Sequence, residues 1–213
     1  MTDPKAAPAP LAARAEQVRA TRQRVLTAAR DLFLRRGYAG TTIEAIAHRA
    51  KVSPQTVYNV IGGKAAVLKA VYDVTLAGDD EPVPMQERPI FAEIAAAPDA
   101  RTALGLYAGL ARDLLSRAGP LLAIIITEGP GRDRELRSFI DKTESERAMG
   151  TRGMARDIAT RFGLPPGITE EEAADVLWTL TSPEVADRLT RRRGWSLDRY
   201  ERWLAKAMAD ALR

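Results

Sequence analysis

Apolar residues recur at three- and four-residue intervals along most of the chain, a period that predicts helices. The pattern is densest over residues 41–64, where it predicts two short helices joined by a tight turn. Thr41 and Glu44 have the spacing of a capping box, so we expect the first of these helices to begin at Thr41 or Thr42. The second helix should begin with Ser53 as its N-cap and Pro54 in its first turn.

The same period continues on both sides of this stretch. Further helices are predicted over residues 24–36, 64–77, 90–97, 99–117, 120–128, 132–162, 169–180, 183–193 and 196–212. Thr169, Ser182 and Ser196 are predicted to cap the last three of them. The segment 120–128 is apolar nearly all round, which is typical of a buried helix. No segment shows the alternation of a β-strand, so the predicted fold class is all-α.

Two changes in composition divide this helical chain. Prolines near the start oppose a helix, so residues 1–20 are predicted to form a flexible arm. Glycine, aspartate and proline are concentrated in residues 78–89, which are predicted to form a linker. The predicted domains are therefore residues 21–77 and residues 90–213.

The short helix that begins at Pro54 has an exposed face with several polar groups. Gln55, Thr56, Tyr58 and Asn59 supply amide, hydroxyl and phenol groups. Amides can pair with adenine, and hydroxyls donate to phosphate oxygens, so the pattern favours nucleic-acid contact. A helical hairpin with a polar, solvent-facing surface would show the same pattern.

The residues on both sides of this hairpin favour the first interpretation. The motifs, in chain order, are Leu32-Phe33, Gly37-Tyr38, Thr41-Thr42-Ile43, Ile46-Ala47, Val52-Ser53, Thr56-Val57-Tyr58 and Lys64. With these motifs, residues 22–75 resemble the DNA-binding domain of the TetR family of bacterial transcriptional regulators. The resemblance implies an all-α protein with an N-terminal three-helix helix-turn-helix DNA-binding domain and a C-terminal helical ligand-binding and dimerisation domain.

Two positions depart from the family pattern. Lys51 stands in the helix-turn-helix turn, where the family usually has glycine. The run Asn59-Val60-Ile61-Gly62-Gly63 replaces the usual aromatic and polar residues. These departures leave the DNA-binding prediction in place, but they put any operator sequence borrowed from the family in doubt.

The resemblance implies a homodimer that binds a near-palindromic operator in double-stranded DNA. The residues expected to contact DNA are Thr41, Thr42, Lys51, Ser53, Pro54, Gln55, Thr56, Tyr58, Asn59 and Lys64. The N-terminal arm would either enter a minor groove or serve as a disordered, solubilising tail.

In the C-terminal domain, the resemblance implies dimerisation through the helices at 169–181 and 196–212. The expected interface residues are Val176, Leu197, Tyr200, Leu204, Ala207, Met208 and Ala211, although the same stripe would also suit packing within one subunit. The resemblance also implies a pocket among the middle helices for a small apolar or aromatic effector. Its candidate residues, each of which would also suit an ordinary core, are Leu106, Tyr107, Leu110, Ile124, Ile125, Phe139 and Trp178.

The distribution of charge agrees with this assignment. Residues 1–77 contain 12 Lys/Arg and 5 Asp/Glu, a net charge of +7, whereas residues 78–213 contain 20 and 23, a net charge of −3. The predicted DNA-binding domain is thus the basic part of the chain, as attraction to phosphate requires. Arg191-Arg192-Arg193 is either a phosphate site or a group of cations that suits a helix C-terminus.

Composition argues against several other classes of protein. The chain has no cysteine and one histidine, His48, so we expect no metal and no cofactor. No nucleophile stands beside a histidine and no glycine-rich phosphate loop is present, so we do not expect an enzyme. No apolar run approaches the length of a membrane span, and the N-terminus lacks the apolar core of a secretory signal. We therefore expect a soluble, cytoplasmic protein.

The function predicted from the sequence is that of a DNA-binding transcriptional regulator, a repressor that a small-molecule effector releases from its operator. The sequence does not distinguish repression from activation. The alternative is a helical protein-interaction module that has lost specific DNA binding. The unusual run from Asn59 to Gly63 is the feature that favours this alternative.

Overall fold

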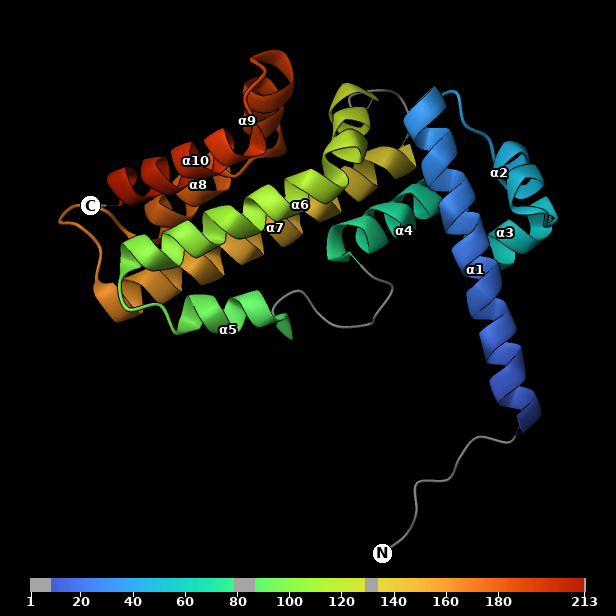
Figure 1. The fold of residues 1–213 in the computed structure, drawn as a ribbon, viewed down its shortest axis with the longest axis horizontal. Coiled ribbons are helices and arrows are strands. Elements are labelled where there is room, and N and C mark those ends of the chain that lie inside the picture. The colour runs from blue at the N-terminus through green and yellow to red at the C-terminus, as the bar shows by residue number, and fades with distance from the viewer. Residues whose placement is uncertain (1–8, 79–86, 129–133, 213) are drawn as a thin grey trace, which may run out of the picture. The chain divides into compact units, whose positions relative to one another are not determined.

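The computed structural model describes residues 9–78, 87–128 and 134–212, and all regular structure within these ranges is helical (Figure 1). The predicted all-α fold is thus confirmed. The chain divides into two compact units, Met1–Asp73 and Val74–Arg213. Most of the predicted linker falls on residues 79–86, which lie outside the described residues.

The N-terminal unit contains α1 (Ala9–Arg36), α2 (Ile43–Ala50), α3 (Pro54–Val60) and the first part of α4 (Lys64–Ala77). The short helices α2 and α3 lie beside α1 and beside each other (Figure 1). Apolar side chains from all four helices form the core, and the fully enclosed ones are Val25, Ala29, Phe33, Ile46, Val57, Val67 and Leu68. Each large side chain among them contributes about 1.5–3 kcal/mol through burial.

The predicted flexible arm is wrong for residues 9–20, which form the first turns of α1. Alanine, leucine, arginine and glutamate dominate this segment, and all four favour a helix. Pro10 lies in the first turn, where its missing N–H leaves no hydrogen bond unmade. Residues 1–8, the rest of the predicted arm, lie outside the described residues.

The C-terminal unit is a bundle built on two long helices, α6 (Ala100–Glu128) and α7 (Arg134–Phe162), each of 29 residues. The shorter helices are α5 (Pro89–Ala95), α8 (Glu170–Leu180), α9 (Pro183–Asp187), the π-helix η2 (Arg188–Arg192) and α10 (Leu197–Ala211). Figure 1 shows α6 and α7 running along each other, and α10 packs mainly on α6 while α8 packs on α7.

Helix α6 continues through Gly119-Pro120, where the sequence predicted a new helix. A proline inside a helix removes one hydrogen bond and kinks the axis without necessarily ending it. The ribbon of α6 accordingly changes direction in its C-terminal part (Figure 1). The predicted break at Gly129-Pro130-Gly131 lies outside the described residues.

The prediction that the segment 120–128 is a buried helix is also wrong. Within it Leu121 is buried, but Ile124, Ile125 and Ile126 are only half-buried. Three adjacent branched aliphatic side chains therefore keep part of their surface open in the single chain.

Candidate nucleic-acid interface and ligand cavities

The turn between α2 and α3 depends on Lys51. This residue has φ 57° and ψ 47°, and among the described non-glycine residues it is the one with positive φ. The N–H of Val52 donates to the carbonyl of Ala47 at 3.0 Å, the long-range bond of a Schellman motif. Lys51 thus ends α2 in the conformation for which glycine is usually selected, and its side chain is exposed.

Hydroxyl groups cap both helices of the hairpin. The Ser53 hydroxyl accepts a hydrogen bond from the N–H of Thr56 at 3.1 Å, as predicted for the start of α3. The Thr42 hydroxyl accepts from the N–H of Ala45 at 3.2 Å, so α2 is capped by Thr42. The N-cap is therefore displaced by one residue from the predicted Thr41, and the alanine at position 45 cannot complete a capping box with Thr42.

The prediction that Thr41 contacts DNA is wrong. Its side chain is 0% exposed, and its hydroxyl donates to the carbonyl of Gly37 at 2.8 Å. It therefore fixes the connection between α1 and α2 from inside the domain. Thr42 occupies the exposed position beside it.

Helix α3 presents the polar face that the sequence predicted. Val57 is fully buried beneath the helix, whereas Gln55, Tyr58 and Asn59 are exposed. The Gln55 side-chain amide donates to the Asn59 side-chain carbonyl at 2.9 Å. This bond leaves the carbonyl oxygen of Gln55 and the amino group of Asn59 open to solvent, an acceptor and a donor of the kind that recognises an adenine edge. Ser53 and Pro54 are also exposed, and Thr56 is half-buried.

Lys64 has a role inside the domain that the sequence did not reveal. Its ammonium group donates to the carbonyl of Tyr38 at 3.0 Å and lies 4.2 Å from the centre of the Tyr38 ring. These contacts tie the start of α4 to the segment that connects α1 and α2. A phosphate contact by Lys64 stays a prediction, and any substitution there will also affect stability.

One cavity in the C-terminal unit lies among α6, α7 and α9 and has a volume of about 310 Å³. Its apolar wall consists of Leu122, Ile125, Ile126 and Ile140, and its polar residues are Arg137, Asp141, Thr143, Glu144 and Glu184. Of the predicted effector residues, Ile125 lines it. The sequence analysis did not predict the polar residues of this cavity. A signal for them was present, because Arg137, Asp141 and Glu144, together with Ile140, have the spacing of a single helix face on α7.

The second cavity is a groove of about 530 Å³ between α6 and α10, lined by the predicted residues Leu106 and Leu110 together with Ile90 and Ala205. Tyr107, Ile124, Phe139 and Trp178 line neither cavity. Phe139 is buried, while Tyr107 and Ile124 are half-buried. Burial raises the pKa of the Tyr107 phenol above its usual range, so this group is neutral at physiological pH.

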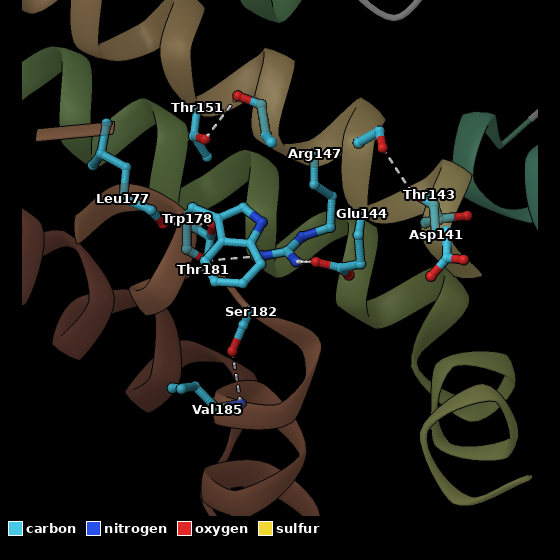
Figure 2. Close-up of polar contacts among 12 residues, drawn as sticks. Asp141, Thr143, Glu144, Arg147, Thr151, Leu177, Trp178, Thr181, Ser182 and Val185 are labelled. Atoms are coloured by element: carbon cyan, nitrogen blue, oxygen red, sulfur yellow. Dashed lines mark hydrogen bonds and ion pairs between the residues drawn. The ribbon is translucent and has the colours of Figure 1, made fainter. Parts of the chain in front are cut away.

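Trp178 lies on α8 and is held by Arg147 of α7 (Figure 2). The Arg147 guanidinium lies 5.4 Å from the centre of the indole ring and donates to the Trp178 carbonyl at 2.8 Å. It also donates to the Glu144 carboxylate at 2.5 Å. The indole is still 38% exposed, so Trp178 belongs to the outer surface of the unit.

Three of the predicted dimer contacts are wrong. Tyr200, Leu204 and Met208 are enclosed in the core of one protomer, where α10 packs on α6. Burial raises the pKa of Tyr200 to about 12. The predicted contacts that keep exposed surface are Val176, Leu197, Ala207 and Ala211.

Within the described residues, no helix is long and apolar enough to cross a membrane.

Comparison with known proteins points to one family. Residues 25–71 match the sequence model of the bacterial regulatory proteins of the tetR family. The chain is 26% identical over 178 residues to the uncharacterized HTH-type transcriptional regulator YdeS of Bacillus subtilis, covering 80% of this chain and 84% of YdeS. It is 28% identical over 178 residues to the HTH-type transcriptional regulator AlkX of Mycobacterium tuberculosis, covering 75% of this chain and 83% of AlkX.

Solved structures share the fold. The structure of NalD, the secondary repressor of the MexAB-OprM multidrug efflux pump in Pseudomonas aeruginosa, matches with a TM-score of 0.72 at 22% identity, covering 92% of this chain and 98% of NalD. FadR from Bacillus subtilis, solved in complex with stearoyl-CoA, matches with a TM-score of 0.68 at 17% identity, covering 87% of this chain and 96% of FadR. The shared fold thus extends beyond the N-terminal unit into the C-terminal unit.

Proposed function

This chain belongs to the TetR family of DNA-binding transcriptional regulators, and from that premise we propose that it is a homodimeric repressor that a small-molecule effector releases from its operator. The observation that carries the proposal is the exposed polar face of α3, held on a buried Val57 and a Ser53 cap. A pair of such helices, one from each protomer, would enter successive major grooves of a near-palindromic site. Gln55 and Asn59 would read bases, and Lys51, Tyr58 and Lys64 would contact phosphates.

The effector site in this proposal is the cavity among α6, α7 and α9. Its volume of about 310 Å³ suits a small molecule. Half-buried isoleucines of α6 line it, and a ligand with apolar or aromatic groups would cover the surface that they leave open. The polar side chains on α7 would fix the orientation of such a ligand. To release DNA, the effector must bind one conformation of the dimer more tightly than the DNA-binding conformation. In that favoured conformation, the spacing of the two α3 helices would not match successive major grooves.

Binding isotherms on the matched operator and on a scrambled sequence, at several salt concentrations, test the DNA-reading role. Gln55→Ala should cost about 1–3 kcal/mol on the matched operator and leave the salt slope nearly unchanged. Lys64→Met should weaken binding about equally on both DNAs and lower the salt slope by roughly one unit. Thermal melting of each variant is needed beside this, because Lys64 also holds Tyr38.

Thr160→Ala is a suitable control, since Thr160 is an exposed polar residue in the C-terminal unit. It should bind both DNAs as the wild type does. Equal losses on both DNAs for Gln55→Ala and Asn59→Ala would mean that sequence is read elsewhere. No measurable binding to any DNA that flanks the gene would favour the protein-interaction module instead.

A further inference from the structure

Helix α1 is longer than the domain that it supports. It begins at Ala9, whereas Val25 is the first of its residues that the structure describes as buried. Residues 13–20 are all exposed. Alanine, arginine, glutamate and glutamine favour a helix, and a helix that grows from an existing one needs no new nucleus. Roughly three turns of α1 therefore project beyond the packed domain.

The projecting part of α1 is basic. Residues 13–24 contain four arginines and one glutamate, a net charge of +3. In the part of the chain that the structure describes, Arg14, Arg19 and Arg22 take part in no ion pair. Each protomer thus offers three uncompensated guanidinium groups to an anionic partner.

The helical period that places the core also places these arginines. The buried side of α1, which packs on α2 and α3, includes Val25. Steps of three and four residues from Val25 toward the start of the helix lead to Arg22, Val18 and Arg14. Arg19 lies next to this row. The side of α1 that faces the hairpin therefore becomes basic where the hairpin no longer covers it.

The two helices of the hairpin follow one another along α1. Thr41, just before α2, bonds to Gly37, just after α1, and Arg49 near the end of α2 pairs with Asp31. Toward the start of α1, α2 is therefore passed first and α3 next, and α1 continues beyond α3 (Figure 1). The uncovered basic side of α1 thus lies at the end of the domain that carries α3.

We infer that the projecting part of α1 is a second DNA-contacting element, which binds phosphates beside the base pairs that α3 reads. The inference rests on the proposed DNA-reading role of α3 and adds a contact outside the helix-turn-helix. A helix rises about 1.5 Å per residue, so Arg14 lies roughly 16 Å beyond Val25 along the axis. This reach corresponds to about five base pairs at about 3.4 Å each. Contacts to the backbone add affinity without adding sequence preference.

The composition of this helix favours DNA over two other partners. A helix that lies on a membrane needs a continuous apolar face, but Val18 is the single large apolar residue of 13–24. Pairing with the same helix of a second copy needs a heptad seam of apolar residues. The positions three and four residues from Val18, on both sides, are arginine, alanine or threonine. Arginine, in contrast, binds phosphate through two parallel hydrogen bonds.

Substitution of the three arginines tests the contact. The probes are DNA that flanks the gene and a scrambled fragment of the same length, each titrated at several salt concentrations. R14Q/R19Q/R22Q should weaken binding to both by the same factor and lower the salt slope by about three units, one for each arginine. Phosphate-ethylation interference should reveal contacts of the wild type that this variant lacks. The control R101Q/R134Q/R152Q removes the same charge from exposed positions of the C-terminal unit and should behave as the wild type does.

Ala20→Pro separates helical placement from charge. Proline at this exposed position interrupts α1 between the core and Arg14, while every arginine remains. The contacts made by Arg14 and Arg19 should disappear from the interference pattern. The melting temperature should stay that of the wild type, because the packed part of α1 begins at Val25. An unchanged interference pattern would mean that a flexible tail makes the contacts, which overturns the inferred role of the helix.

The outcomes also separate this inference from the proposed function. If the wild type binds the flanking DNA and R14Q/R19Q/R22Q has the same salt slope as the control variant, this inference alone is wrong. If R14Q/R19Q/R22Q instead loses only binding to phosphatidylglycerol vesicles, the projecting helix binds a membrane and the inference is again overturned. A wild-type protein that binds neither DNA fragment overturns the proposed function and this inference with it.

Discussion

At the scale of single residues, Lys51 combines a left-handed backbone conformation with a proposed phosphate contact. Its left-handed conformation costs an L residue roughly 1–2 kcal/mol, which glycine would avoid at an entropic cost of roughly 0.5–1 kcal/mol. We predict that Lys51→Gly raises the free energy of unfolding by about 0.5–1 kcal/mol in urea denaturation. The same change should weaken binding to all DNA sequences and lower the salt slope by about one unit, because a phosphate contact is lost.

Lys51→Asn separates the two effects. Asparagine tolerates the left-handed region but carries no charge, so it should bind DNA as weakly as the glycine variant. Wild-type affinity and salt dependence in both variants would show that Lys51 does not neutralise a phosphate.

The helix caps show which residue-level features can be predicted from sequence. Ser53, Thr169, Ser182 and Ser196 cap their helices as predicted, because a cap is a contact between residues two or three positions apart. The choice between Thr41 and Thr42 could not be made locally. It depends on the burial of Thr41 inside the folded domain, where its hydroxyl donates to the Gly37 carbonyl in the segment that connects α1 and α2.

At the scale of elements, the last helix has an amphipathic stripe whose partner the sequence does not identify. Leu204 is 0% exposed and packs within its own protomer. We predict that Leu204→Ala lowers the free energy of unfolding by about 2–5 kcal/mol, through the lost contacts and the cavity left behind. Ala207→Glu, at a half-buried position of the same helix, should leave the free energy of unfolding nearly unchanged and weaken dimerisation.

Urea denaturation and sedimentation on both variants check this assignment. A folded, monomeric Leu204→Ala protein with wild-type stability would show that Leu204 belongs to the dimer face after all.

The junction of α9 and η2 depends on pH through Asp187. Hydrogen bonding from Arg191 lowers the pKa of the buried Asp187 carboxyl below its usual range. A carboxyl with a lowered pKa in the folded state stabilises the fold above its unfolded pKa of about 3.9, and this stabilisation is lost as the pH falls through the folded value. We predict that Asp187→Asn costs about 1 kcal/mol at pH 7, since both arginines are exposed.

The lowered pKa of Asp187 also determines how the stability difference between wild type and Asp187→Asn changes with pH. Urea denaturation of wild type and Asp187→Asn should show a constant gap near neutral pH and a shrinking gap below about pH 4. A gap that stays constant to the lowest pH would mean that the ion pairs do not stabilise the fold.

Two elements show why helix boundaries are harder to predict than helices. The prolines near the chain start suggested an arm, but Pro10 falls in the first turn of α1, where proline is compatible with a helix. Gly119-Pro120 suggested a break, but α6, which packs against α10 and α7, continues through it. In neither case does proline end the helix, because Pro10 leaves no hydrogen bond unmade in a first turn and Pro120 removes only one from a long helix.

At the scale of the whole molecule, the two units differ in charge in a way that suits their proposed roles. The net charge of +7 over residues 1–77 favours encounter with DNA, and the net charge of −3 over the remainder keeps the C-terminal unit from competing for phosphate. This division could be predicted from sequence. The cavity among α6, α7 and α9 could not, because it requires Ile125 on α6, Glu144 on α7 and Glu184 on α9 to be brought together by the fold.

If the effector binds in this cavity, release of DNA and stabilisation of the fold should be caused by the same compound. A compound that releases the wild-type protein from DNA should also raise its melting temperature, by the equivalent of about 2.7 kcal/mol at a hundred times its dissociation constant. Ile125→Trp should fill the cavity, abolish both effects and leave DNA binding intact without the compound. Ile90→Trp, in the groove between α6 and α10, is the matched control and should respond as the wild type does. If the compound still acts on Ile125→Trp, or competes with DNA at the N-terminal unit, the release does not pass through this cavity.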